Sequence, residues 1–330
     1  MNPLSVLRRG RLWLALLATA ALALAAAELA SRQVLGLGTP PLYEADADYE
    51  YRLLPGQDVQ RFGNRVRVNQ WGMRADEFGA RKASADELRV LVVGDSVVNG
   101  GSQIDQRQLA STLLQHSLQT ALGRPVTVGN VSTGSWGPGN WLAYARRHGF
   151  HDADLVLLVV NSGDYADNPA YAPLGVDFPT RPPVLALQEA ALRYLPRYLP
   201  ALAPAQAGPE VPGQPAAAEV ARGLADLDAY LALARAEGRK VLVLHHPDRE
   251  ELASGRYLPG YTAMGGLLQG LGVDFVELAP TYRPYASLVY RDGIHLGAAG
   301  QLLLAQALHG AALRALGALG APAAGDRLLS

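Results

Sequence analysis

The stretch Arg89–Gly101, RVLVVGDSVVNGG, decides the fold, because an apolar strand ends there abruptly in a small polar turn. Val90–Val93 are apolar and mostly β-branched, which is typical of a short strand buried on both faces of a parallel sheet. The run ends at Gly94-Asp95-Ser96, so Ser96 is expected at a strand's carboxyl end, where ligands bind in open α/β sheets. Ser96 is therefore either a nucleophile facing a crevice or a serine that caps the next helix.

Helices and strands alternate after this stretch. The periodicity predicts helices over 109–122, 140–149, 217–237, 261–271 and 297–319, and strands over 126–131, 155–160, 240–244 and 273–278. This order predicts an α/β fold, a three-layer α/β/α sandwich with a central parallel sheet. Before it, residues 49–73 are expected to form a small β extension, with a strand at 65–69 after the turn residues Phe62-Gly63-Asn64.

One compositional break interrupts the alternation, at residues 168–215, which are rich in proline, alanine and tyrosine. We expect one helix there, over 185–194, and a loop-like tract over 204–215. So long an excursion between two strands is either a lid or binding loop, or a solvated surface insertion.

Composition excludes several classes of protein. The chain has 330 residues, of which 49% are hydrophobic, enough for a large core. Its net charge of −1 shows no excess of basic residues of the kind that binds nucleic acid, so no nucleic-acid partner is predicted. The absence of cysteine excludes disulfides and thiolate chemistry, and the seven histidines lack metal-site spacing, so neither a metal nor another cofactor is expected.

The amino terminus has the charge order of an export signal or signal anchor. Leu12–Ala27 is uncharged and apolar and follows Arg8, Arg9 and Arg11. Cleavage after Ala27 is one alternative, and we favour retention as an inner-membrane anchor with the following domain in the periplasm. The expected units are the anchor or signal segment 1–35, a stalk and β extension 36–87, and the main domain 88–330 with its insertion.

A second candidate motif stands near the carboxyl terminus. Asp292 and His295 are three residues apart, just before the last expected helix. On one tight turn this spacing brings a carboxylate and an imidazole within hydrogen-bonding reach, as a base and its orienting acid require. Taken alone, the pair is also compatible with a polar turn.

Together, the strand-end serine and the Asp-x-x-His motif resemble the SGNH hydrolases, also called the GDSL family, over about residues 88–313. The first of four family blocks is matched by Gly94-Asp95-Ser96 and the last by Asp292–His295. The resemblance implies a flavodoxin-like fold, with Ser96 as nucleophile, His295 as general base and acid, and Asp292 as its orienter.

The two middle blocks depart from the family pattern. In block two the family glycine donates a backbone N–H to the oxyanion hole, and here Gly134 comes one residue early with Ser135 in the expected place. In block three, Asn161-Ser162-Gly163-Asp164, Gly163 stands where the family has an asparagine donor. The expected oxyanion hole is therefore Ser96, Gly134 or Ser135, and Asn161.

Three further groups carry expectations. Trp136 and Trp141 either stack on sugar rings or pack locally. Of the adjacent His245 and His246, one is expected in the core and one toward the cleft, because neighbouring strand residues point to opposite faces. The acidic residues of 164–168 are expected on a solvated loop.

The predicted function is a serine esterase that removes O-acetyl groups from a surface or secreted polysaccharide. The expected partners are an acylated carbohydrate substrate and, through the amino-terminal segment, a membrane. The alternatives are an O-acyltransferase acting on polysaccharide, or a non-catalytic polysaccharide-binding protein that retains the fold.

Overall fold

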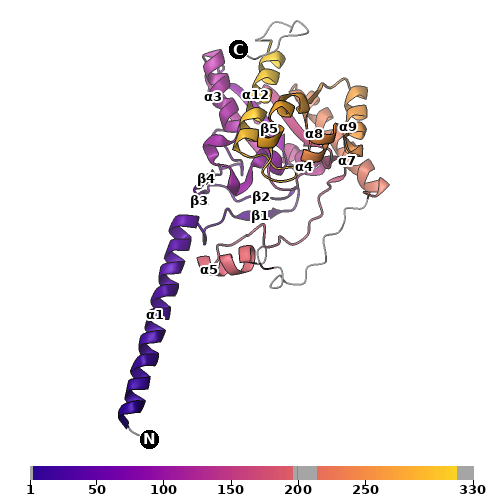
Figure 1. Cartoon of the computed structure of the whole chain (residues 1–330). Coiled ribbons are helices and arrows are strands. Elements are labelled where there is room, and N and C mark those ends of the chain that lie inside the picture. The colour runs from indigo at the N-terminus through magenta and orange to yellow at the C-terminus, as the bar shows by residue number, and fades with distance from the viewer. Residues whose placement is uncertain (1–2, 196–198, 200–213, 318–330) are drawn as a thin grey trace.

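The computed structural model of the chain describes residues 3–195, 199 and 214–317 (Figure 1). Its main elements, in chain order, are α1 (Pro3–Leu35), β1 (Tyr43–Asp46), β2 (Glu50–Leu53), β3 (Asp58–Arg61), β4 (Asn64–Arg67), β5 (Leu88–Gly94), α2 (Ser96–Asn99), α3 (Ala110–Leu122), β6 (Val126–Ser132), α4 (Pro138–His148), β7 (Leu155–Asn161), α5 (Ala186–Glu189), η4 (Ala190–Tyr194), α7 (Ala217–Ala236), β8 (Lys240–His246), α8 (Arg249–Ser254), α9 (Pro259–Gly270), β9 (Phe275–Glu277), α10 (Ala279–Tyr282), α11 (Ala286–Val289) and α12 (Ala298–Ala315).

The central sheet has five parallel strands in the order β6-β5-β7-β8-β9. Strand β5 pairs with β6 along its whole length, from Leu88 opposite Val126 to Gly94 opposite Ser132. All residues of β5 and β7 are buried, as their continuous apolar runs predict for strands covered on both faces. The predicted α/β class with a central parallel sheet is confirmed.

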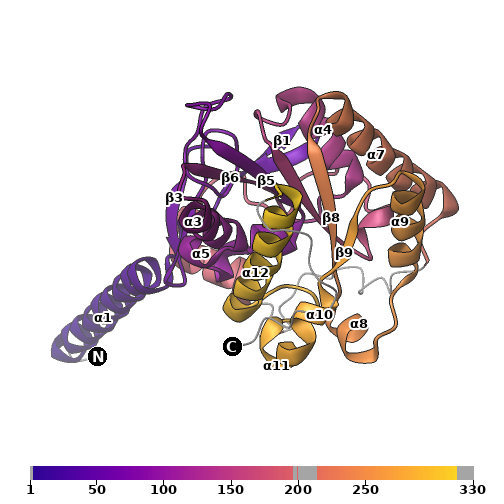
Figure 2. The same cartoon turned by 90° about the horizontal axis from the view of Figure 1, so that it is seen from above.

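Helices cover both faces of this sheet (Figure 2). Helices α3 and α12 pack against each other and bury Val90, Val92 and Leu157 beneath them. Helices α4, α7 and α9 cover the opposite face over Leu91 and Val93. The alternation of side chains along each strand therefore divides the apolar core into two layers.

The expected β extension consists of two antiparallel hairpins, β1–β2 and β3–β4. The strand expected at 65–69 is β4, which begins at Asn64. Phe62 and Gly63 form its turn with φ of 51° and 79°, the left-handed conformation that a tight hairpin of this twist requires.

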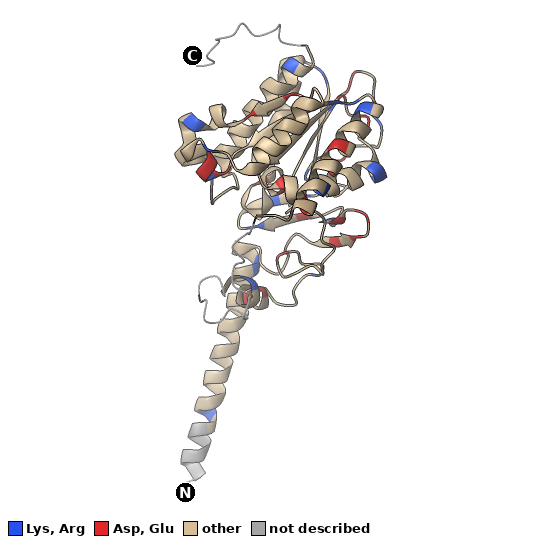
Figure 3. Cartoon of the chain, turned by 90° about the vertical axis from the view of Figure 1, so that its right-hand side faces the viewer, with Lys and Arg blue, Asp and Glu red and all other residues tan. Residues whose placement is uncertain are grey.

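Helix α1 projects from the domain and carries charged residues only near the ends of its described length (Figure 3). Residues Gly10–Leu35 are long and apolar enough to cross a membrane, with a mean hydropathy of 2.0 over their most apolar part. The expected stalk after this helix is not a free linker, because Leu37 is buried and the Gly36 carbonyl accepts a hydrogen bond from Arg61 Nη1 at 2.7 Å.

The insertion contains the helix expected at 185–194, seen here as α5 continued by the wide turn η4. Most of the loop-like tract expected at 204–215, and the end of the helix expected at 297–319, lie outside the described residues. Phe178 of the insertion packs on Tyr43 and Tyr51 of the first hairpin, with ring centroids 5.1 and 4.8 Å apart.

Candidate active site

Ser96 is placed by the sharp turn between β5 and α2. Asp95 caps the helix, with its Oδ1 accepting a hydrogen bond from Val97 N at 2.8 Å, and Ser96 is the first helical residue. Gly94 is required before it, because a Cβ there would meet Val98 Cγ2 at 2.6 Å and the Val159 carbonyl oxygen at 2.9 Å. Ser96 itself is half-buried, so its hydroxyl is held firmly yet stays accessible from the sheet's carboxyl edge.

The Asp292–His295 turn brings its two side chains to this serine. His295 Nε2 lies 2.9 Å from Ser96 Oγ, and His295 Nδ1 lies 2.9 Å from Asp292 Oδ2. The other carboxylate oxygen, Oδ1, accepts hydrogen bonds from the backbone N–H groups of Ile294 and His295 at 3.0 and 2.7 Å. The structure thus joins the three predicted residues in one hydrogen-bonded chain, although Ser96 and His295 are 199 residues apart.

The charge of Asp292 determines which atoms donate and which accept in the hydrogen bonds that join Asp292, His295 and Ser96. Burial raises the pKa of Asp292, but the N–H donors of Ile294 and His295 and the His295 ring outweigh it, and the pKa falls to about 2. Asp292 is therefore ionised near neutral pH and can only accept from Nδ1–H. Nε2 of neutral His295 is left as the acceptor for the Ser96 hydroxyl.

Two further contacts hold the turn in place. Arg291 Nη1 donates to the Gly100 carbonyl at 3.0 Å, which ties the turn to the loop that follows Ser96. His246 Nε2 lies 2.9 Å from the Ile294 carbonyl oxygen, which it can reach as a donor.

His246 and its neighbour His245 are both 0% exposed. The expectation that one of them faces the cleft is therefore wrong, because Tyr261 of α9 packs against His245 and Tyr282 of α10 packs against His246.

Backbone donors are available beside the serine. Among the hydrogen bonds of the described residues, none uses the N–H groups of Ser96, Gly134 or Ser135. The Gly134 carbonyl accepts from the Tyr51 hydroxyl at 2.5 Å, and Ser135 has a φ of 45°, so this loop has a defined shape. Gly134 is half-buried and Ser135 is exposed. These groups have the chemistry that an oxyanion hole needs.

Asn161 reaches the site edge but is fully engaged there. Its Nδ2 donates to Asp95 Oδ2 at 3.0 Å and to Asp164 Oδ1 at 2.7 Å, and its Oδ1 accepts from Gly163 N at 2.7 Å. Both amide hydrogens are thus used by carboxyl groups. In this conformation Asn161 has no hydrogen left for a substrate.

The acidic segment after β7 is not the solvated loop that the sequence suggests. Asp164 is 2% exposed, because the segment turns inward beneath α7 and α9. Burial, followed by the nearby Asp95, raises the pKa of Asp164 well above its ordinary value. Burial likewise raises the pKa of Asp95 to about 6 and that of Asp167 to about 7. A cluster of carboxyl groups therefore lies directly behind the nucleophile turn; the sequence showed these acidic residues but not that they are buried next to Asp95.

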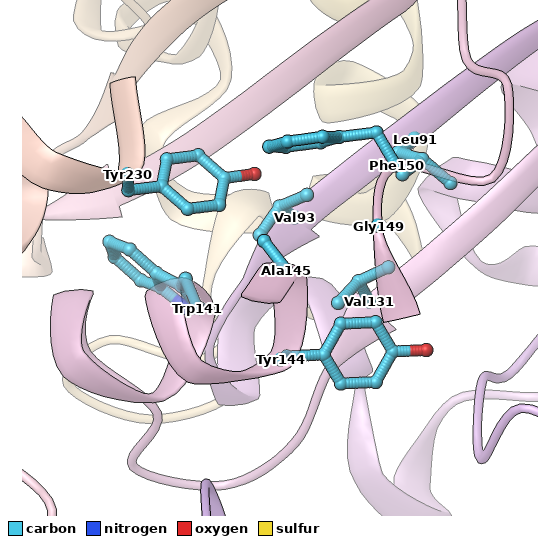
Figure 4. Close-up of a pocket in the computed structure, with 9 residues that line it drawn as sticks. All are labelled: Leu91, Val93, Val131, Trp141, Tyr144, Ala145, Gly149, Phe150 and Tyr230. Carbon is cyan, nitrogen blue, oxygen red and sulfur yellow. The ribbon is translucent and has the colours of Figure 1, made fainter. Parts of the chain in front are cut away.

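The two tryptophans pack locally and do not line the cleft. Trp136 and Trp141 are 2% and 1% exposed, and their indole N–H groups donate to the carbonyls of Tyr51 and Gly94. Trp141 also lines a small apolar pocket inside the core, between the sheet and helices α4 and α7 (Figure 4). None of the three hydrogen-bonded residues Ser96, Asp292 and His295 lines that pocket.

A second polar network, missed from the sequence, anchors the block-three loop from behind. Ser162 Oγ donates to Glu251 Oε1 at 2.5 Å and lies 2.9 Å from His245 Nε2. All three side chains are buried. Within the described part of the chain, no group of three or more histidine, aspartate or glutamate side chains is arranged to hold a metal ion.

No protein-family model and no curated protein sequence matches this chain. Similar solved structures include a psychrotrophic esterase, EstA, from Pseudoalteromonas sp., with a TM-score of 0.41 and 14% identity, covering 69% of this chain and 98% of that one. TesA has a TM-score of 0.43 and 20% identity over 69% of this chain and 99% of its own. The acetylxylan esterase Axe2 from Geobacillus stearothermophilus has a TM-score of 0.43 and 14% identity over 72% and 96%. Each of these proteins is similar to this chain at low sequence identity, and the α/β fold of the chain is established by its own five-stranded parallel sheet.

Proposed function

We propose that this chain is a serine esterase of the SGNH type, with Ser96 as nucleophile, His295 as general base and acid, and Asp292 as the orienting carboxylate. The observation that carries the proposal is the continuous hydrogen-bonded chain through these residues, with contacts of 2.9 Å on both sides of the imidazole. An ionised Asp292 and a serine at the carboxyl edge of the sheet complete the requirements for nucleophilic acyl transfer.

The proposed reaction follows from the role of His295 Nε2 as the acceptor for the Ser96 hydroxyl. His295 Nε2 takes the Ser96 proton as Oγ attacks the ester carbonyl carbon, and the imidazolium that forms is stabilised by Asp292. The tetrahedral intermediate collapses to an acyl-serine when His295 gives the proton to the leaving alcohol. A water molecule, deprotonated by the same nitrogen, then releases the acid and regenerates Ser96.

The oxyanion of that intermediate is proposed to bind the backbone N–H groups of Ser96 and of Gly134 or Ser135. Gly163 has no side chain to contribute a third donor, and Asn161 would have to release Asp95 or Asp164 to replace it. Loss of one such donor typically costs about 10²–10³-fold in turnover. We therefore propose an enzyme of modest turnover, or one in which substrate binding frees Asn161.

The proposed substrate is an O-acetyl ester on a polysaccharide outside the cytoplasm. Helix α1 with the arginines at its start favours an inner-membrane anchor and a periplasmic domain. A polar alcohol is favoured by Asp167, whose half-buried carboxyl group accepts no hydrogen bond from any described residue and approaches Asp95 and Glu50. Such a carboxyl group can accept hydrogen bonds from sugar hydroxyls.

The test uses the full chain in detergent with an activated acetyl ester, comparing the wild type with Ser96→Ala and, as a matched control, the exposed Ser84→Ala. We expect wild-type activity in the control and only buffer hydrolysis in Ser96→Ala. Equal rates for wild type and Ser96→Ala would overturn the catalytic assignment. An inactive wild type that binds glycans would favour the binding protein, and acetylated polysaccharide formed from an acetyl donor would favour the acyltransferase.

A further inference from the structure

The insertion presents apolar side chains to solvent close to the amino-terminal helix. Val184 and Leu192 are 82% and 65% exposed, and Leu185 and Leu195 are also exposed. We call these four residues the apolar ridge. A cluster of exposed aliphatic side chains on one short segment of a folded domain commonly marks an interaction surface.

The carboxyl end of α1 determines where this ridge lies. The Glu28 carboxylate accepts hydrogen bonds from Ala186 N and Leu187 N at 2.8 and 2.9 Å, and Arg32 Nη2 donates to the Val184 carbonyl at 2.9 Å. Glu28 is also the first charged residue after the uncharged run of α1. The ridge is therefore held at the level of the helix where a membrane span would leave the bilayer.

The ridge is also tied to the folded domain. Glu189, in the same segment, accepts a hydrogen bond from Gly38 N at 2.7 Å and forms a buried ion pair with Arg61 of β3. Gly36 leaves no room for a side chain, since its Cβ would lie 2.2 Å from the Gln60 carbonyl oxygen. Anchor helix, ridge and hairpin β3–β4 thus meet in one packed junction.

The carboxyl edge of the central sheet faces this junction. Asn64 Nδ2 of β4 donates to the Ser102 carbonyl, in the loop after the Ser96 helix, at 3.1 Å. On the other side of the site, a Cβ at Gly134 would lie 3.1 Å from the ring of Phe178 in the insertion. Figure 1 agrees, because α1 leaves the domain on the side of the hairpins, away from the carboxyl end of α12.

We propose that the apolar ridge rests in the interfacial layer of the bilayer that α1 crosses, and so holds the Ser96 edge of the domain toward the membrane surface. The occupant of the ridge is lipid, because the ridge is continuous with a helix whose apolar surface is itself unburied by protein. The substrate that this orientation favours is an acylated carbohydrate chain at or emerging from that surface. The inference rests on the proposed anchoring by α1.

The absence of cysteine allows single-site labelling of the full chain. Leu192→Cys, Leu17→Cys in α1, and Leu302→Cys on α12 as the control each carry an environment-sensitive fluorophore. Leu302 is a suitable match because it is also an exposed leucine. Each labelled protein is reconstituted in phosphatidylcholine–phosphatidylglycerol vesicles with or without brominated acyl chains, and aqueous iodide is added separately.

We expect brominated lipid to reduce the emission of the labels at positions 17 and 192 but not at 302, and iodide to quench only the label at 302. Quenching by lipid at 17 but not at 192 would overturn the membrane contact of the ridge while leaving the anchor. Absence of lipid quenching at 17 would overturn the anchor and with it this inference. Neither result bears on the esterase assignment, which the Ser96→Ala comparison tests separately.

Discussion

Arg61 and Glu189, 128 residues apart in the sequence, form an ion pair whose side chains are only 1% and 5% exposed. Arg61 also donates to the Gly36 carbonyl at 2.7 Å and to the Tyr194 hydroxyl at 2.8 Å. One guanidinium group therefore joins the β extension, the segment after α1 and the insertion. Its fork of donors suits such a buried site better than a lysine would.

Glu189→Gln should loosen this junction, because it leaves the buried Arg61 charge uncompensated. Breaking a buried pair from one side typically costs about 3–5 kcal/mol, whereas an exposed pair is worth at most about 1 kcal/mol. The exposed pair Arg65–Asp58 provides the control, Asp58→Asn. Hydrogen exchange of residues 186–194 should accelerate in Glu189→Gln and stay unchanged in Asp58→Asn. Equal protection in both variants would show that the insertion is held by other contacts.

The sequence predicted the central sheet well because local patterns determine it. The apolar runs at Val90–Val93 and Leu155–Val160 are typical of strands covered on both faces, and both form such strands. The docking of the insertion was not predictable in the same way. It depends on single long-range contacts such as that of Glu28 with Ala186 N, which leave no periodic signal in either segment.

Asp292→Asn should reduce kcat for an acetyl ester by about 10³–10⁴-fold, because an amide favours the wrong His295 tautomer. The fold should survive, since the amide oxygen can still accept from Ile294 N and His295 N. The exposed Asp86→Asn serves as the matched charge control. Steady-state rates and circular dichroism of both variants check this. Near-normal kcat in Asp292→Asn would exclude the proposed orienting role.

At the site, residue spacing predicted the contact between side chains within one turn. It could not predict how the segment after β7 packs beside that turn. Asp292 and His295 are three residues apart, so any tight turn pairs them. The surroundings of Asn161 depend instead on how the segment after β7 packs. There Asp164 points inward and takes the amide hydrogen that a substrate oxyanion would need.

His151 is buried, and neither of its ring nitrogens has a hydrogen-bond partner among the described residues. It packs against Trp71 and Phe78, with ring centroids 4.7 and 5.7 Å away. Burial, followed by the charges of His148 and Arg89, lowers its pKa to about 4. The pKa of His151 is therefore lower in the folded chain than in the unfolded chain. As the pH falls from about 6.5 toward 4, the unfolded chain binds a proton at His151 and the folded chain does not, so the folded state loses stability.

His151→Phe should therefore be more stable relative to the wild type in acid than at pH 8. We expect its stability relative to the wild type to increase by about 2 kcal/mol from pH 8 to pH 5, because the substitution removes the titrating group. Comparison at two pH values cancels the strain of a phenylalanine at the φ of 50° that His151 adopts. Urea unfolding at the two pH values measures this difference. The exposed His116→Phe should show no comparable increase at pH 5. A gain independent of pH would contradict the lowered pKa.

Asp167→Asn should show the opposite pH dependence. Burial, followed by the charges of Asp95 and Glu50, raises the pKa of Asp167 from 3.8 to about 7. Between these values the folded chain holds a proton that the unfolded chain has released, so wild-type stability falls as the pH rises from about 4 to about 7.

An asparagine at position 167 does not ionise, so the stability of Asp167→Asn relative to the wild type should increase by about 1–3 kcal/mol from pH 5 to pH 8. Urea unfolding at both pH values measures this, with the exposed Asp86→Asn as control. If Asp167 also accepts a hydrogen bond from a sugar hydroxyl, Asp167→Asn should raise KM for an acetylated oligosaccharide. KM for a small activated ester should change little, because that substrate has no sugar hydroxyl to bind Asp167. If the stability of Asp167→Asn relative to the wild type is instead lower at pH 8 than at pH 5, the protein itself stabilises the Asp167 carboxylate. That result would contradict the proposal that this carboxyl group binds the substrate.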